Sequence, residues 1–260
     1  MKPLTRRELL ALAGIAAGSC ALSSCVREQL ASPPAKKPRL RWAFARLDPD
    51  TTADRAYQDY YQGHCMYAVF KSIVGQLAEQ PGEPYKSFPF DMMKYGAGGV
   101  AGWGSLCGGL NGGAAVIALF ATTQDQARLL THELLRWYET AALPAYVPKT
   151  AKLSMEMPKS VSNSVLCHVS VSSWCKVSGH RAFSKEHNER CARLAADTAK
   201  MTVQILNRSL QDQFAATHAL SPETKSCNSC HARGGKLENS LGEMSCSACH
   251  FSGGQKHPNL

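Results

Sequence analysis

The sequence has few features that would hold the protein in a membrane or on a nucleic acid. The apolar run near its N-terminus, Leu9 to Leu22, is shorter than the ~20 residues that a transmembrane helix needs. The formal net charge is +9, but no long Lys/Arg run with interleaved aromatic residues occurs, so we expect no nucleic-acid partner. The basic charge suits an anionic membrane surface or an acidic protein partner instead.

The sequence also lacks the common signatures of catalysis. A glycine-rich stretch runs from Tyr95 to Phe120, but it lacks the preceding strand that a nucleotide-binding loop needs. No pattern of a nucleophile with its base is present either. We therefore expect a protein that is not an enzyme, with a small oxidoreductase as the alternative.

The N-terminus has the features of an export signal. Arg6 and Arg7 precede the apolar run, as in a twin-arginine signal, which exports folded proteins. An ordinary secretory signal with two arginines is the alternative. The residues that end at Cys25, Leu-Ser-Ser-Cys, resemble a lipobox. We predict that residues 1–25 are a signal and that the protein is periplasmic, either free or anchored to the membrane by a lipid on Cys25.

The remaining chain divides by composition into a linker, a helical domain and a tail. Prolines among basic residues indicate a linker over 26–50, and apolar residues at helical spacing predict a helical bundle over 51–219. From about residue 220 the chain is rich in Gly, Ser, Cys and His, which predicts a small loop-rich tail over 220–260. The fold class is therefore all-α.

The apolar spacing within the domain predicts individual elements. We expect helices that are stopped by prolines or begun by capping residues, with Thr122 or Thr123 as one cap and Ser184 as another. The run Val165 to Val171 suggests a short extended segment. The helices are expected over 52–80, 107–120, 123–140 and 185–216.

The tail contains two Cys-x-x-Cys-His motifs, at 227–231 and 246–250. This pattern is typical of c-type haem attachment, because the two thiols form thioethers with the haem and the next residue ligates the iron. The motifs predict two haem c groups, in a di-haem cytochrome tail. The attachment residues are Cys227, Cys230, Cys246 and Cys249, and the proximal ligands are His231 and His250.

The same four cysteines also fit a zinc ribbon, with spacing C-x2-C-x15-C-x2-C, or two disulfides. Zinc does not require a histidine directly after each pair, and bare thiols oxidise outside the cytoplasm. Haem is therefore the favoured interpretation. Each haem iron then needs a sixth ligand, and a second histidine gives a low-spin electron carrier. The candidate distal ligands, which flank the long predicted helix, are His180, His187 and His218.

A second set of cysteines lies in the helical region. Its five members are Cys65, Cys107, Cys167, Cys175 and Cys191. They could be buried structural residues or disulfides, although an odd number leaves one unpaired. Four of them could instead bind an iron–sulfur cluster from separate helices. Export in the folded state favours the cluster, because such clusters are assembled in the cytoplasm.

These cysteines also carry a resemblance to a known family. The segments Gly63–Val69 and Cys107–Gly112, followed by Cys167 and Cys191, resemble the C-GCAxxG-C-C redox family, and Gly109 stands where the pattern has Ala. With both haem motifs, about residues 50–250 resemble split-Soret cytochrome c. The resemblance implies a homodimer with stacked haems and a [2Fe-2S] cluster. It leaves open whether Cys167 or Cys175 is the third cluster ligand.

The expected function is electron transfer with redox partner proteins. The second haem motif begins 19 residues after the first (246 minus 227), so the two haems are tethered close together. The alternatives are a small periplasmic haem oxidoreductase and a zinc-ribbon binding module.

Overall fold

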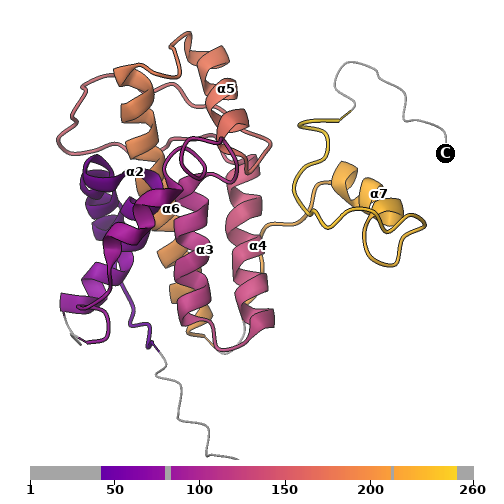
Figure 1. Ribbon diagram of the computed structural model, residues 1–260, viewed down its shortest axis with the longest axis horizontal. Coiled ribbons are helices and arrows are strands. Elements are labelled where there is room, and N and C mark those ends of the chain that lie inside the picture. Colours follow the sequence, from indigo (N-terminus) through magenta and orange to yellow (C-terminus); the bar gives the residue numbers. More distant parts are fainter. Residues whose placement is uncertain (1–41, 80–82, 212–213, 251–260) are drawn as a thin grey trace, which may run out of the picture. The chain divides into compact units, whose positions relative to one another are not determined.

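The computed structural model describes residues 42–79, 83–211 and 214–250 of the 260-residue chain (Figure 1). Within these ranges every regular element is a helix. The only β-type pairing there is two isolated bridges, Leu106 with Leu166 and Leu143 with Ser160. The all-α prediction is confirmed. The predicted signal, Cys25 and most of the predicted linker lie outside the described residues.

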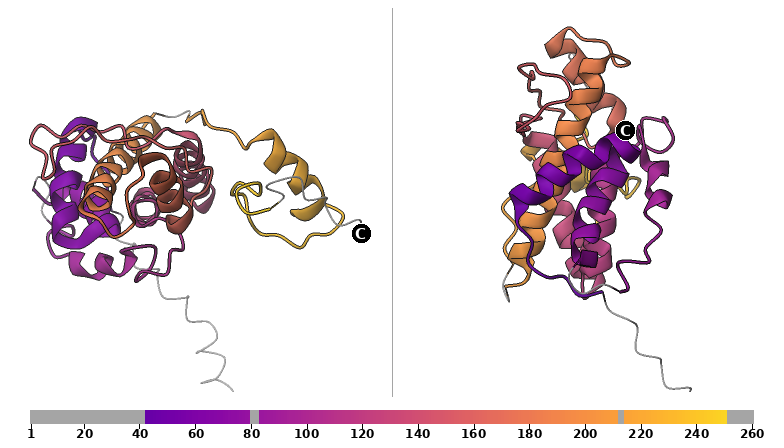
Figure 2. Two further views of the ribbon diagram at one scale, coloured as in Figure 1. Left: turned by 90° about the horizontal axis from the view of Figure 1, so that it is seen from above. Right: turned by 90° about the vertical axis from the view of Figure 1, so that its left-hand side faces the viewer.

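Four helices form the bundle: α2 (Pro49–Glu79), α3 (Gly108–Phe120), α4 (Gln124–Thr140) and α6 (Lys185–Ser209). Helix α2 packs most extensively on α6 and also on α3, and α3 contacts α4 and α6 (Figures 1 and 2). The apolar faces of these helices enclose a single core. No helix in the described part of the chain is both long enough and apolar enough to cross a membrane.

Helix α2 is kinked, whereas the apolar spacing predicts a continuous helix. His64 has φ 63° and ψ −164°, outside the helical region. A Cβ on the preceding Gly63 would lie 2.3 Å from the Tyr67 ring, so the close packing at the kink requires glycine. The kink starts a new helical segment at Cys65.

The glycines of α3 allow that helix to approach its neighbours closely. A Cβ on Gly108 would lie 2.3 Å from the carbonyl oxygen of Gly96, and one on Gly112 would lie 2.7 Å from the carbonyl oxygen of Met66. Gly96 ends the short 3-10 helix η1 (Phe90–Gly96). The predicted tight packing of this glycine-rich helix is therefore present, and it brings the start of α3 against the kink of α2.

The predicted caps are in place, but the predicted end of the long helix is wrong. Thr123 Oγ1 accepts a hydrogen bond from the Gln126 amide at 3.1 Å, and Ser184 Oγ accepts one from the His187 amide at 3.2 Å. Helix α6 ends at Ser209 rather than at residue 216. The chain leaves the helix there because the Glu133 carboxylate binds the backbone amide of Thr217 at 3.0 Å.

The predicted extended segment over 165–171 is also wrong. Leu166 forms an isolated bridge with Leu106, but helix α5 (Cys167–Ser178) begins at the next residue. Trp174 on this helix is fully buried and its Nε1 donates to the Pro158 carbonyl at 2.9 Å. Tertiary packing therefore overrides the extended preference of the valines.

The predicted loop-rich tail contains one helix, α7 (Pro222–His231) (Figure 2). Ser221 Oγ accepts a hydrogen bond from the Thr224 amide at 3.1 Å, and proline occupies the first helical position. Helix α7 ends with the first haem motif.

Candidate metal centres

Four of the five cysteines of the helical domain converge from four different helices. Cys65 follows the kink of α2, Cys107 directly precedes α3, Cys167 begins α5, and Cys191 lies in α6. Two backbone hydrogen bonds tie the second and third positions together. The Cys107 amide donates to the Val165 carbonyl at 2.9 Å, and the Cys167 amide donates to the Ser105 carbonyl at 2.7 Å.

The four sulfur atoms form one electrostatic group. A direct hydrogen bond with Cys191, together with burial, raises the pKa of Cys65 well above its usual value. The same hydrogen bond lowers the pKa of Cys191. Burial raises the pKa of Cys107, and burial with the neighbouring Cys107 and Cys191 raises that of Cys167 to about 12. Because their pKa values are raised, Cys65, Cys107 and Cys167 ionise only beside positive charge, such as a metal supplies.

Cys175 stands apart from this group. It lies two turns along α5 from Cys167, and its backbone carbonyl accepts the C-capping hydrogen bond from Gly179 at 2.9 Å. None of the interactions of the four converging thiols involves it. Between the two cysteines that the sequence left open, the structure places Cys167 in the group.

A cavity of about 580 Å³ opens beside the four-cysteine group. The glycine loop after η1 forms one wall, and a Cβ on Gly99 there would lie 2.9 Å from the Cys167 Cβ. Its lining includes Cys65, Cys167, Cys191 and His187. Within the described ranges, no three His, Cys, Asp or Glu side chains have the geometry of a single-ion site. Four free thiols carried by separate segments of the chain are the donor set that an iron–sulfur cluster uses.

Three side chains form hydrogen bonds with these sulfur atoms. His187 Nε2 lies 3.4 Å from Cys191 Sγ, and Arg190 Nη1 lies 3.7 Å from the same sulfur. The buried Tyr138 hydroxyl is hydrogen-bonded to the Cys107 thiol. The sequence analysis missed Arg190 and Tyr138. The one available signal was that Arg190 directly precedes Cys191, on a helix whose neighbouring residues are mostly buried.

The three candidate distal haem ligands have different surroundings. His187 contacts Cys191, and both His180 and His187 pack on Trp174, with ring centroids 5.8 and 6.2 Å away. These two histidines therefore belong to the surroundings of the cysteine group. His218 lies in the segment before α7, where its Nδ1 is 3.0 Å from the Glu133 carboxylate.

The two haem motifs are local structures that lie beside one another. The first occupies the last turns of α7, and the second forms a turn in which the His250 amide donates to the Cys246 carbonyl at 2.9 Å. A hydrogen bond and charge interaction link the Cys227 and Cys246 thiols, and with burial they raise the pKa of Cys246. Cys230 and Cys249 are exposed. Such open, closely spaced thiols are accessible to a haem.

The proximal histidine of the first motif is held by the tail itself. His231 Nδ1 lies 2.7 Å from Asn239 Oδ1, and the His231 carbonyl accepts a hydrogen bond from the Ser240 amide at 3.0 Å. A hydrogen bond at one ring nitrogen is the usual way in which a protein orients a metal-ligating histidine. The local structure therefore fits the predicted ligand role.

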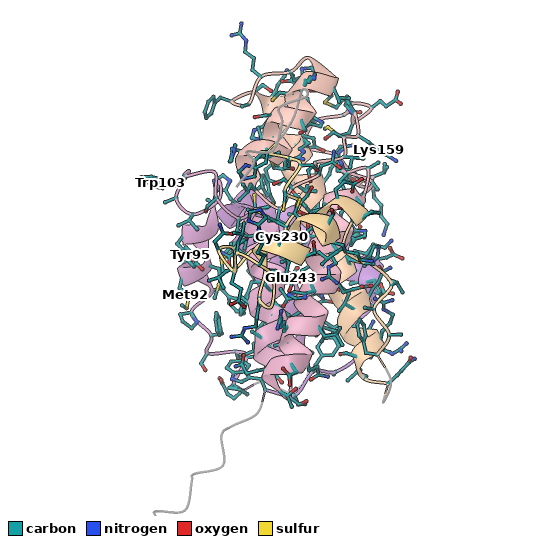
Figure 3. The ribbon with its side chains drawn as sticks, turned by 90° about the vertical axis from the view of Figure 1, so that its right-hand side faces the viewer. Met92, Tyr95, Trp103, Lys159, Cys230 and Glu243 are labelled. Atoms are coloured by element: carbon teal, nitrogen blue, oxygen red, sulfur yellow. The ribbon has the colours of Figure 1, made fainter. Side chains whose placement is uncertain are left out.

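The tail contacts helix α4 through one carboxylate. Glu243 accepts hydrogen bonds from Arg128 and Arg136, each at 2.8 Å, and lies 3.1 Å from His132 Nδ1 (Figure 3). Nearby, the Ser245 amide donates to Glu139 at 2.8 Å. We call Glu243 and its three basic partners the Glu243 cluster. Glu243 lies three residues before Cys246, so the Glu243 cluster links the second haem motif to α4.

A second buried carboxylate holds the segment that leads into the tail. Glu133 on α4 is 1% exposed and accepts hydrogen bonds from the amides of Thr217 and His218 and from Arg208. Although burial opposes it, these hydrogen bonds lower the pKa of Glu133 to about 2. The carboxylate is therefore ionised under all ordinary conditions.

Comparison with known proteins agrees with the arrangement of the cysteines. A family model described as "Putative redox-active protein (C_GCAxxG_C_C)" matches residues 64–205. The split-Soret cytochrome c of Desulfovibrio desulfuricans is 39% identical over 204 residues, which cover 76% of this chain and 73% of that protein.

The fold agrees as well. A solved structure of the split-Soret cytochrome c from Desulfovibrio desulfuricans, described as having a novel iron centre, matches with a TM-score of 0.78 at 39% identity. The match covers 83% of this chain and 93% of the other. The resemblance drawn from the cysteine segments and the haem motifs is thus confirmed, and the chain belongs to the C_GCAxxG_C_C redox-active family as a member of its split-Soret cytochrome c group.

Proposed function

We propose that the protein is an exported electron carrier with two covalent haems in its tail and a [2Fe-2S] cluster in its helical domain. The observation that carries the proposal is the convergence of four reduced cysteines from separate helices in a chain that also has two adjacent Cys-x-x-Cys-His motifs. The named family, with its iron-centre relative, supports it.

In the helical domain, Cys65, Cys107, Cys167 and Cys191 would hold the cluster, which exchanges one electron at a time. The chain around them shapes that centre. His187 and Tyr138 are hydrogen-bonded to the sulfur atoms of Cys191 and Cys107, and such bonds tune a cluster's potential. The glycine at position 99 keeps side-chain bulk away from Cys167.

In the tail, Cys227 with Cys230 and Cys246 with Cys249 would attach the haems, which likewise exchange single electrons. His231 and His250 would be the proximal ligands, with Asn239 orienting the first. Of the candidate distal ligands, we retain His218, because His180 and His187 pack on Trp174 within the bundle. The contact between Cys227 and Cys246 supports two closely spaced haems.

The cellular setting is also part of the proposal. The paired arginines support periplasmic export by the twin-arginine route, and Cys25 supports a lipid anchor. The protein would be a homodimer that exchanges electrons with redox partner proteins, as the resemblance of its cysteine segments and haem motifs implies.

Quantitation of haem, iron and sulfide tests the cofactor assignment in protein from a host that matures c-type haem. We expect covalent haem from both motifs, acid-labile sulfide, and a reduced-state electron paramagnetic resonance signal of a [2Fe-2S] cluster. Cys167→Ser should lose the sulfide, whereas the matched control Cys175→Ser on the same helix should keep it. Colourless protein with bound zinc would contradict the proposal and favour a zinc ribbon.

A second measurement separates a carrier from a haem oxidoreductase. The reduced protein is mixed with nitrite, hydroxylamine or peroxide, and consumption of the substrate is followed under continuous reduction. A carrier should show no sustained consumption of the substrate beyond the few electrons that its own centres store. Sustained turnover would show an enzyme instead.

A further inference from the structure

Arg190 is a buried cation that has no carboxylate partner among the described residues. Its side chain lies in the core and the residue is 2% exposed. In the described part of the chain its guanidinium donates to Ser170 Oγ at 2.7 Å, to the Ser170 carbonyl at 3.4 Å and toward Cys191 Sγ at 3.7 Å. None of these groups is a carboxylate. Its Nε is buried and has no hydrogen-bond partner there.

The next arginine on the same helix shows how this fold usually handles a buried cation. Arg193 is 4% exposed, and its Nε donates to the Glu189 carboxylate at 2.8 Å. The tyrosine hydroxyls of Tyr57 and Tyr61 donate to Glu189 as well. That pair is therefore charge-balanced and fully hydrogen-bonded, as buried ions normally are. Arg190 lacks such a balance.

Within the described ranges, the negative charge that can balance Arg190 comes from the cysteine group and its surroundings. Arg190 lies beside Cys191, and through Ser170 it reaches Tyr138, which is hydrogen-bonded to Cys107. A cluster bound by four thiolates carries net negative charge, and reduction adds one more electron to it. A fixed cation in a low-dielectric core favours the more negative state. Net charge and hydrogen bonds to sulfur are two of the terms that set a cluster's potential.

We propose that Arg190 is the counter-charge of the cluster and raises its reduction potential by stabilising the reduced state. This inference rests on the proposed function, because it requires the cluster. The positive charge of Arg190 would act on the cluster. The hydrogen bonds to Ser170 would only hold the guanidinium in place. A purely structural arginine would support the fold without moving the potential.

Redox titration of the full haem-loaded protein tests the role, with the cluster followed by electron paramagnetic resonance and the haems by visible absorbance. Arg190→Gln should shift the cluster midpoint to a more negative potential and move the haem midpoints less. Arg190→Lys keeps the charge and should retain most of the wild-type potential. Arg193→Gln is the matched control: it removes a buried arginine of the same helix, lowers stability and leaves the cluster midpoint nearly unchanged.

Each other outcome also decides the question. Folded Arg190→Gln protein without a cluster, beside Arg190→Lys protein that retains one, would support the need for the charge. An unchanged midpoint in Arg190→Gln would overturn the proposal. So would equal loss of the cluster from both folded variants, or Arg190→Gln protein that does not fold by circular dichroism. If wild-type protein itself contains no acid-labile sulfide, it is the proposed function that fails.

Discussion

The helical domain and the tail build their candidate metal centres in opposite ways. In the domain, Cys65, Cys107, Cys167 and Cys191 are far apart in sequence and meet only because α2, α3, α5 and α6 pack together. In the tail, each haem motif is one continuous pentapeptide on a helix end or a turn. The first kind of site depends on the whole fold, whereas the second needs little more than its own residues.

Burial differs in the same direction. Cys107 and Cys191 are buried, but Cys230 and Cys249 are exposed. A cluster held by the domain would be surrounded by the chain's own hydrogen-bonding groups, which would set its electrostatics. The tail offers open thiols and has little core, so covalent haem would supply the apolar mass that the tail lacks. We therefore expect loss of the cluster to destabilise the packing of the whole domain. Loss of a haem should destabilise only the part of the tail around its own motif.

The largest expected effect is that of Cys191→Ser. Removing one thiolate from α6 should abolish the cluster, and the domain should lose several kcal/mol of unfolding free energy, because metal-binding energy is coupled to folding. Both haems should remain attached. Chemical unfolding followed by circular dichroism, with sulfide and haem quantitation, measures these effects. Retention of full stability after cluster loss would show that the bundle does not need the cluster.

The complementary change in the tail is Cys249→Ser. It should remove one thioether and weaken or abolish covalent attachment at the second motif only. Haem staining after denaturation and mass spectrometry should detect the loss. Sulfide content and the unfolding midpoint of the bundle should stay at the values of the unmodified protein. A matching loss of sulfide would contradict the independence of the two regions.

Glu133→Gln tests the junction between the regions. The folded-state pKa of about 2 lies below the ordinary 4.5, so the carboxylate stabilises the fold above pH 4.5, and this contribution is lost as the pH falls toward 2. The depressed pKa corresponds to about 3 kcal/mol at neutral pH. Glu133→Gln should therefore be less stable by about 3 kcal/mol at pH 7, and the difference should shrink between pH 4.5 and 2.

Urea unfolding of both proteins at several pH values measures this difference. The variant retains the size of the side chain and removes only its charge. A gap that does not depend on pH would mean that the hydrogen bonds to Thr217 and His218, and not the ionised state, provide the stability.

The smallest expected effect is that of Glu243→Gln, which weakens the Glu243 cluster. Its partners are partly exposed, so we expect a loss of about 1 kcal/mol or less in the docking of the tail segment. Amide hydrogen exchange of the segment around Ser245 should become faster. Salt should reduce the difference from the unmodified protein, because it screens surface ion pairs.

The control for this change is Glu238→Gln in the same tail. Glu238 accepts a hydrogen bond from the Gly234 amide at 2.6 Å, a contact within the tail itself. It should not alter exchange around Ser245. Equal effects from both variants would show that the Glu243 cluster has no special role in docking.

Local features of the fold could be predicted well, and tertiary ones could not. Thr123 and Ser184 cap the helices as predicted, because capping depends on a few neighbouring residues. The helix from Cys167 to Ser178 was missed, since its valines favour extended structure until Trp174 is buried. The end of α6 was placed too late, because Glu133, distant in sequence, captures the chain at Thr217.

The sequence by itself determined the all-helical class, the two haem motifs and the family, because each of these depends on residue spacing that a linear chain preserves. Only the tertiary structure decided that Cys167 rather than Cys175 joins the other three thiols. It also placed His180 and His187 beside Trp174 and left Arg190 buried beside Cys191 without a carboxylate. The physical reason is that burial, and the pairing of charges within it, arises from contacts between segments that are distant in the sequence.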